Sequence, residues 1–98
     1  MPGAAADRKV VHVFVAGTVQ GVWFRAWTVE QANARGLDGW VRNRRDGSVE
    51  AVFSGPEIQV DEMLKRCAKG PPDAKVTNVT VTDEGGAPPS GFKVLPTL

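Results

Sequence analysis

The 98-residue sequence is poor in several residue types, and each shortage excludes a class of protein. A single cysteine, Cys67, excludes an internal disulfide and a zinc site built from cysteines. The only histidine is His12, and no group of His, Cys, Asp and Glu has the spacing of a metal site. Neither sign of charge dominates, because 12 basic and 11 acidic residues give a net charge of +1. We therefore expect neither a metal nor a nucleic-acid partner.

Long hydrophobic runs are also missing. No segment has the length and hydropathy of a membrane span, so no membrane partner is expected. Residues 1–9 are small and polar, contain no signal-peptide core, and are predicted to form a flexible tail. Residues 10–98 are long enough for one domain and too short for two. The expected location is the cytoplasm.

Hydrophobic periodicity and turn residues predict most of the secondary structure. Residues 10–16 alternate like a strand, and residues 23–35 favour a helix, although their apolar period is indistinct. Residues 39–43 and 48–53 are short apolar runs separated by the turn sequence RRDG, which is typical of a hairpin. A second helix, with Pro56 as its first residue, has one buried stripe formed by Val60, Met63, Leu64 and Cys67. Residues 76–82 and 92–95 complete the pattern as strands.

The resulting order predicts a ferredoxin-like βαββαβ sandwich of the α+β class, with a short extra C-terminal strand. We expect an antiparallel sheet with both helices on one face. A right-handed helical crossover joins the first two strands, so these strands run in the same direction. The segment after the first strand and the end of the second strand should therefore lie at one edge of the sheet.

The nonapeptide GTVQGVWFR, at residues 17–25, connects the first strand to the first helix. Such a turn points backbone N–H groups and the positive end of the helix dipole at one spot, which suits a phosphate. Arg25 follows in the first helical turn, where its guanidinium can hold phosphate oxygens in bidentate fashion. Taken alone, two glycines in such a turn are commonly structural, and the loop lacks the remaining residues of nucleotide-binding motifs. The expected phosphate-binding residues are Gly17, Thr18, Val19, Gln20, Gly21 and Val22.

Asn43 ends the second predicted strand. Taken alone, an asparagine at this place more often ends a strand or begins a turn. Because the first and second strands run in the same direction, however, we expect Asn43 to face the 17–22 loop and Arg25.

The segments GTVQGVWFR (17–25) and GWVRNRRDGSV (39–49) together resemble the paired signature motifs of the acylphosphatase family. The similarity extends over most of residues 10–95, including FSGP at 53–56 and GPP at 70–72. It implies a small enzyme that hydrolyses acyl phosphates to a carboxylate and inorganic phosphate; with the chain's size, it suggests a monomer. It also implies that Arg25 binds the phosphoryl group and that Asn43 orients the attacking water.

Two features depart from the family pattern. Thr18 occupies a position that is often basic, and Arg44 and Arg45 make the turn after Asn43 more basic than in many relatives. The two arginines are candidates for electrostatic steering of anionic substrates.

The chemistry is consistent with these residues. The leaving carboxylate has a conjugate acid with a pKa of about 4 to 5, so it departs without a general acid. Phosphoryl transfer then needs mainly positioning and charge stabilisation, which Arg25 and the loop amides can supply. Asn43 can orient water for direct in-line attack, but as a poor base it leaves the proton to a phosphate oxygen of the substrate. No metal or cofactor is expected.

Two alternatives remain from other classes of protein. The RNA recognition motif shares the element order, but the third strand, SVEAVF at residues 48–53, has one aromatic and an acidic residue. A noncatalytic anion-binding or regulatory domain of the same fold, or an acylphosphatase-like unit that passes a carbamoyl group to a partner, is the stronger alternative, because a fold does not determine a function.

The remaining distinctive residues have structural interpretations. His12 lies in the first strand and is expected to be structural or exposed, and Cys67 to be buried and inert. The three tryptophans are predicted to be packing residues, although Trp23 is also a candidate wall for an acyl-binding rim.

Overall fold

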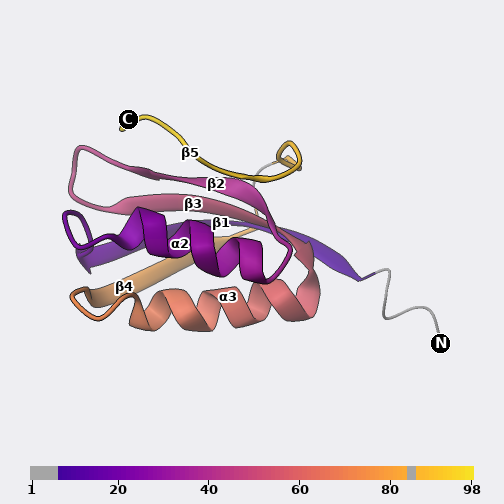
Figure 1. Ribbon diagram of the computed structural model, residues 1–98, viewed down its shortest axis with the longest axis horizontal. Helices are drawn as coiled ribbons and strands as arrows, with labels where there is room; N and C mark the ends of the chain where they lie inside the picture. Colours follow the sequence, from indigo (N-terminus) through magenta and orange to yellow (C-terminus); the bar gives the residue numbers. More distant parts are fainter. Residues whose placement is uncertain (1–6, 84–85) are drawn as a thin grey trace.

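The computed structural model describes residues 7–83 and 86–98, which form a five-stranded sheet with two helices on one face (Figure 1). This arrangement confirms the predicted element order and the ferredoxin-like α+β fold. The elements in chain order are β1 (Arg8–Thr18), α2 (Phe24–Ala34), β2 (Asp38–Asn43), β3 (Val49–Pro56), α3 (Glu57–Lys69), β4 (Lys75–Thr82) and β5 (Phe92–Val94).

The sheet has the strand order β4-β1-β3-β2-β5 and is mixed, so the expectation of a wholly antiparallel sheet was wrong. β1 pairs antiparallel with β3 and β4, and β2 pairs antiparallel with β3. β1 and β2 therefore run in the same direction, as predicted. β5 pairs parallel with β2, Gly39 lying opposite Phe92. The parallel pairing arises because β4 runs opposite to β2 and therefore finishes at the end of the sheet where β2 starts. The chain that follows β4 begins β5 at that same end, so β5 runs in the direction of β2.

Strand β1 begins earlier than predicted. Arg8 and Lys9, which we expected in a tail, lie opposite Pro56 and Gly55 of β3. Lys9 Nζ also forms a 2.6 Å ion pair with Asp61 of α3. These pairings are possible because β3 continues to Pro56, which precedes α3 instead of starting it. The rest of the predicted tail, residues 1–6, lies outside the described residues.

The hydrophobic core lies between the sheet and the two helices. Alternate residues of β1 face the helices, and α3 contributes the predicted buried stripe, with Leu64 only partly buried. On α2 the buried residues are Phe24, Thr28 and Ala32, and the Thr28 hydroxyl donates to the carbonyl oxygen of Phe24 at 2.8 Å. The core residues with at most 1% exposure include Val11, Val13, Val15, Val19, Thr28, Ala32, Val41, Val49, Phe53, Val60, Met63 and Cys67.

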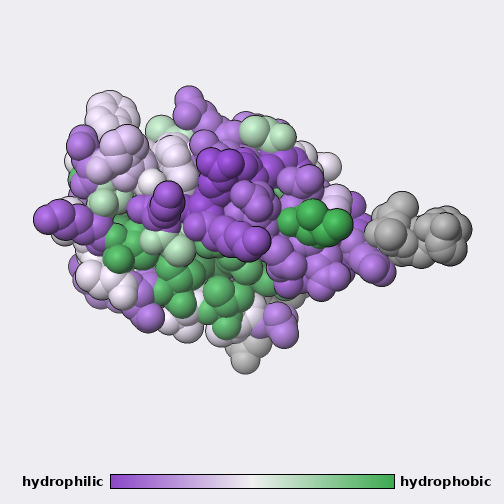
Figure 2. Space-filling view, turned by 90° about the horizontal axis from the view of Figure 1, so that it is seen from below, coloured by the Kyte–Doolittle hydropathy of each residue, from purple (hydrophilic) through white to green (hydrophobic). Residues whose placement is uncertain are grey.

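The side of the molecule that carries α3 is mainly polar, with a hydrophobic area beside it (Figure 2). α3 faces solvent with charged residues such as Lys65 and Arg66. The neighbouring edge strand β4 leaves Val81 42% exposed. No helix within the described ranges is long and apolar enough to cross a membrane.

Candidate active site

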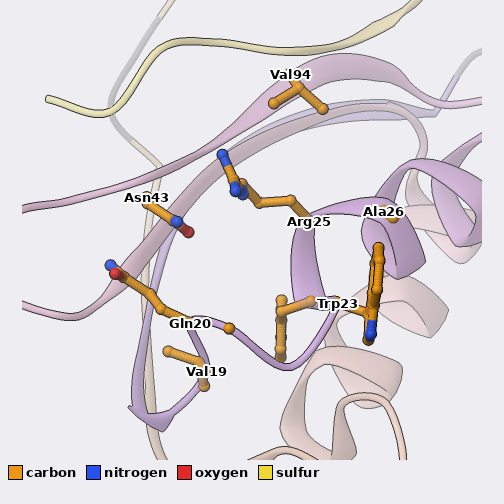
Figure 3. A pocket seen from close by; sticks show the side chains of 9 residues that line it. Val19, Gln20, Trp23, Arg25, Ala26, Asn43 and Val94 are labelled. Atoms are coloured by element: carbon orange, nitrogen blue, oxygen red, sulfur yellow. The ribbon is translucent and has the colours of Figure 1, made fainter.

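A pocket of about 520 Å³ opens where the β1–α2 loop, the start of α2, the end of β2 and β5 meet (Figure 3). The parallel course of β1 and β2 brings these segments to one edge of the sheet, and with them Arg25 and Asn43. The lining residues are Val19, Gln20, Gly21, Trp23, Phe24, Arg25, Ala26, Asn43 and Val94.

Three of the six predicted loop residues line this pocket, and three do not. Gly17 and Thr18 belong to β1, where they lie opposite Val76 and Lys75 of β4 after a register shift. The strand extends beyond its predicted end because β4 continues to pair with it. Val22 packs against the core instead.

The start of α2 is suited to an anion. Phe24 is the first helical residue, Trp23 at the N-cap makes no side-chain capping hydrogen bond, and the first turn contains no acidic residue. The first N–H groups of a helix have no intrahelical partner, and the helix dipole adds a partial positive charge there. Because Trp23 does not cap them, these donors are available to a ligand.

Arg25 lies in this first turn and is exposed. Its guanidinium extends across the pocket toward Asn43 (Figure 3). Arg42 and Arg44, by contrast, are held by ion pairs to Glu50. Among the described residues none forms an ion pair with Arg25, so its charge is available to a ligand.

Asn43 occupies the last position of β2, opposite Val49 of β3. Its backbone oxygen accepts a 3.1 Å hydrogen bond from the N–H of Leu98. The side-chain amide lies between Arg25 and Gln20 (Figure 3). Asn43 Oδ1 is shielded from solvent and accepts no hydrogen bond from any described residue. The amide oxygen is therefore uncommitted.

Gln20 ties the loop to the turn that follows Asn43. Its Nε2 donates to the carbonyl oxygens of Arg44 at 2.7 Å and Ser48 at 2.8 Å. The sequence showed Gln20 only as a member of the loop, because nothing local indicates a contact with residues so distant in the chain.

Glu50 forms a charged cluster on the sheet face opposite the helices. It is 3% exposed, and its Oε1 accepts hydrogen bonds from Arg42 Nε at 2.7 Å and Arg44 Nη1 at 2.9 Å. Its Oε2 lies 2.6 Å from His12 Nε2, which confirms a structural position for the histidine. Burial disfavours the charged carboxylate, but the bonds from Arg42, His12 and Arg44 outweigh it and lower the pKa of Glu50 to about 2. Of the two arginines considered for steering, Arg44 is therefore paired and Arg45 is exposed.

Trp23 does not pack as predicted, since it is 79% exposed at the pocket. It is also the only non-glycine residue of the described chain with a positive φ, at 66°. Trp27 and Trp40 are half-buried, Trp27 against the core and Trp40 against His12 and Arg42. Cys67 is buried as expected, and burial raises the pKa of its thiol to about 12.

Within residues 7–83 and 86–98, no three His, Cys, Asp or Glu side chains are grouped so that they could hold a metal ion. The polar side chains that line the pocket carry one guanidinium and two amides, and no carboxylate. This set matches an anion rather than a cation.

The known proteins that are similar to this chain share one family name. The family model described as Acylphosphatase matches residues 11–94. The acylphosphatase of Rhizorhabdus wittichii is 55% identical over 92 residues, covering 94% of this chain and 93% of that protein. The acylphosphatase of Rhodospirillum rubrum is 51% identical over 90 residues, covering 92% and 99%. The structure of an acylphosphatase from Coxiella burnetii has a TM-score of 0.87 and 34% identity, covering 97% of this chain and 100% of that one. The chain belongs to the acylphosphatase family.

Proposed function

We propose that this protein hydrolyses the carboxyl–phosphate bond of acyl phosphates, releasing a carboxylate and inorganic phosphate. The observation that carries the proposal is the meeting of Arg25 and Asn43 in one pocket, at an uncapped helix start, in a chain of the acylphosphatase family. In this reaction water attacks phosphorus in line with the departing carboxylate, without a metal ion.

Arg25 and the backbone N–H groups around the start of α2 bind the phosphoryl oxygens. The guanidinium is exposed to the pocket and has the fork geometry that matches two phosphate oxygens. Val19, Gln20 and Gly21 form the loop wall beside it. Preorganised donors of this kind stabilise charge as it develops in the transition state.

Asn43 orients the attacking water. Its side-chain amide lines the pocket and can accept a hydrogen bond from water through Oδ1, once that atom turns toward the pocket, and donate one to the water through its NH₂ group. An amide is not a base at neutral pH, so the proton of the water passes to a phosphoryl oxygen of the substrate.

The leaving group needs no proton donor. Among the described residues that line the pocket, none is a carboxylic acid or a histidine. A carboxylate is stable as an anion above a pH of about 5, so the C–O–P bond can break without protonation of the bridging oxygen.

We also infer that residues 8–98 act as a single domain in a cytoplasmic monomer, with the acyl phosphate and inorganic phosphate as its ligands. The pocket is formed within one chain, so the reaction as proposed does not require a second copy. Light scattering during size-exclusion chromatography measures the oligomeric state.

The test of the proposal is phosphate release from acetyl phosphate by the purified protein in the presence of a chelator. We expect hydrolysis that the chelator does not reduce and that inorganic phosphate inhibits competitively. A folded protein that binds phosphate but releases none from acetyl phosphate would favour the noncatalytic anion-binding domain. A rate that depended on an enzyme group titrating near neutral pH would contradict the assigned proton transfer.

A further inference from the structure

The pocket is larger than its phosphoryl-binding part. A phosphate has five heavy atoms, which occupy roughly 150 Å³ if each takes the volume of a water molecule. The pocket holds about 520 Å³ and is open to solvent, so it has room for more than the phosphoryl group. In an acyl phosphate, the acyl group is the part that can occupy this additional space.

The remaining walls are apolar. Among the lining residues, the polar side chains are those of Gln20, Arg25 and Asn43. The other lining side chains are those of Val19, Trp23, Phe24, Ala26 and Val94, and Gly21 contributes only backbone. Arg25 is the one charged side chain among these lining residues, and the phosphoryl group uses it. A second carboxylate on the acyl chain would therefore find no cation within the described lining.

Trp23 is the most unusual of these apolar residues. It is 79% exposed, and its backbone has φ 66° and ψ 20°, a left-handed conformation that is unfavourable for a bulky side chain. The exposed ring contributes little to the core, so core packing does not explain this conformation. Strained residues of this kind cluster at ligand sites, where the strain holds a side chain in place.

The neighbours of Trp23 extend the apolar wall. Ala26 lies three residues further along the start of α2, on the same side of the helix. Val94 of β5 is 49% exposed and lies on the other side of Arg25 (Figure 3). Figure 3 shows Trp23 and Ala26 at the start of α2 and Val94 on β5, with the Arg25 side chain between them. All three line the pocket that holds Arg25, so the acyl group of a bound substrate can contact them.

We infer, on the basis of the proposed function, that Trp23, Ala26 and Val94 form an acyl-binding subsite. The enzyme prefers acyl phosphates of uncharged, apolar monocarboxylic acids longer than acetate. Trp23 is the specificity-determining residue, because it is the largest apolar side chain of the lining and is 79% exposed.

The test compares acetyl, butyryl and hexanoyl phosphate. All three have straight-chain carboxylate leaving groups of similar basicity, so differences in kcat/KM report binding of the chain. We expect kcat/KM to rise about twofold to fourfold for each added CH₂ group, the upper value being that of complete burial. Trp23→Ala removes most of this dependence, and Trp23→Phe retains it.

Ile58→Ala is the matched control. Ile58 is 78% exposed in the first turn of α3 and does not line the pocket, so its loss should leave the chain-length dependence unchanged. Inhibition by inorganic phosphate, which has no acyl group, measures the phosphoryl-binding part of each variant separately.

Two results would overturn the inference: equal kcat/KM for the three substrates, or an undiminished chain-length dependence in Trp23→Ala. Failure of the proposed function is distinguishable, since it would abolish turnover of all three substrates. In that case the affinities of acylphosphonates, which resist hydrolysis, still test the subsite by calorimetry. Tighter binding of the longer acylphosphonates, and its loss in Trp23→Ala, would support it; equal affinities would overturn it.

Discussion

Gln20 donates a 2.7 Å hydrogen bond to the carbonyl oxygen of Arg44, the residue that follows Asn43. With a second bond to Ser48, it connects the loop between β1 and α2 to the turn after the residue proposed to orient water. The loop and Asn43 are therefore held in one arrangement before a substrate binds.

Replacing Gln20 should loosen this connection. In Gln20→Glu the two donors are replaced by a carboxylate that repels the carbonyl oxygens of Arg44 and Ser48. We expect kcat/KM to fall by about 10-fold to 100-fold, and the free energy of unfolding to fall by about 1–3 kcal/mol. Steady-state kinetics and urea denaturation measure both quantities. Wild-type values for this variant would show that the connection has no role.

Arg25 should be required for binding of the phosphoryl group. In Arg25→Gln the charge is lost, and we expect kcat/KM to fall by at least about 10³-fold, with much weaker inhibition by inorganic phosphate. Arg25→Lys restores the charge without the bidentate fork and should recover only part of the activity. Arg66→Gln, on the exposed side of α3, is the control and should behave as the wild type.

Asn43 should affect turnover more than binding. In Asn43→Ala we expect kcat to fall by about 10²-fold to 10³-fold, while the inhibition constant of phosphate changes by less than about threefold. Because Asn43 Oδ1 accepts no hydrogen bond from the described residues, its removal leaves no donor among them unpaired. The free energy of unfolding should therefore change by less than about 1 kcal/mol. A large rise in the phosphate inhibition constant would assign Asn43 to binding instead.

Glu50 should make the stability depend on pH. Its pKa in the folded protein is about 2, below the ordinary value of 4.5, so its ionisation stabilises the fold above pH 4.5. This stabilisation, at most about 3 kcal/mol, is lost as the pH falls from 4.5 toward 2. Urea denaturation at several pH values measures it. Glu50→Gln should be less stable at neutral pH and should lose this part of the acid dependence, whereas Glu30→Gln, exposed on α2, should retain it.

Two glycines differ in how much they tolerate a side chain. A Cβ at Gly39, where φ is +142°, would lie 1.8 Å from the carbonyl oxygen of Val52 in the neighbouring strand. A Cβ at Gly47, where φ is +95°, would meet no atom within 4 Å. We expect Gly39→Ala to lower the free energy of unfolding by about 3 kcal/mol or more, and Gly47→Ala by about 1–2 kcal/mol. Thermal denaturation ranks the two, and equal losses would contradict this reasoning.

The helices and strands whose apolar residues repeat at a regular spacing could be predicted from the sequence. Val11, Val13 and Val15 alternate along β1, and Val60, Met63 and Cys67 repeat along α3, so each pattern indicates one buried face. On α2 the buried face includes Thr28, whose hydroxyl is satisfied within the helix, and a polar residue type conceals that pattern. The parallel direction of β5 depends on the path of the chain around the sheet, which no local pattern records.

The candidate site also has parts that could be predicted from the sequence and parts that could not. The meeting of Arg25 with Asn43 could be predicted, because a right-handed crossover determines the relative direction of β1 and β2. The double contact of Gln20 and the cluster around Glu50 depend on side-chain orientation across the sheet, and neither has a local signal. The exposure of Trp23 was missed because tryptophan is usually buried, and its left-handed backbone has no sequence marker outside glycine and asparagine.

Strand β3 contributes no residue to the lining of the pocket, yet Arg25 and Asn43 are brought together through it, because β1 and β2 both pair with β3 and not with each other. Bringing the two residues together therefore requires β1, β3 and β2 to be in register. During refolding from denaturant, recovery of phosphate release should follow the slowest phase of sheet formation, while helix formation precedes it. Activity would then serve as a kinetic reporter of the completed β-sheet.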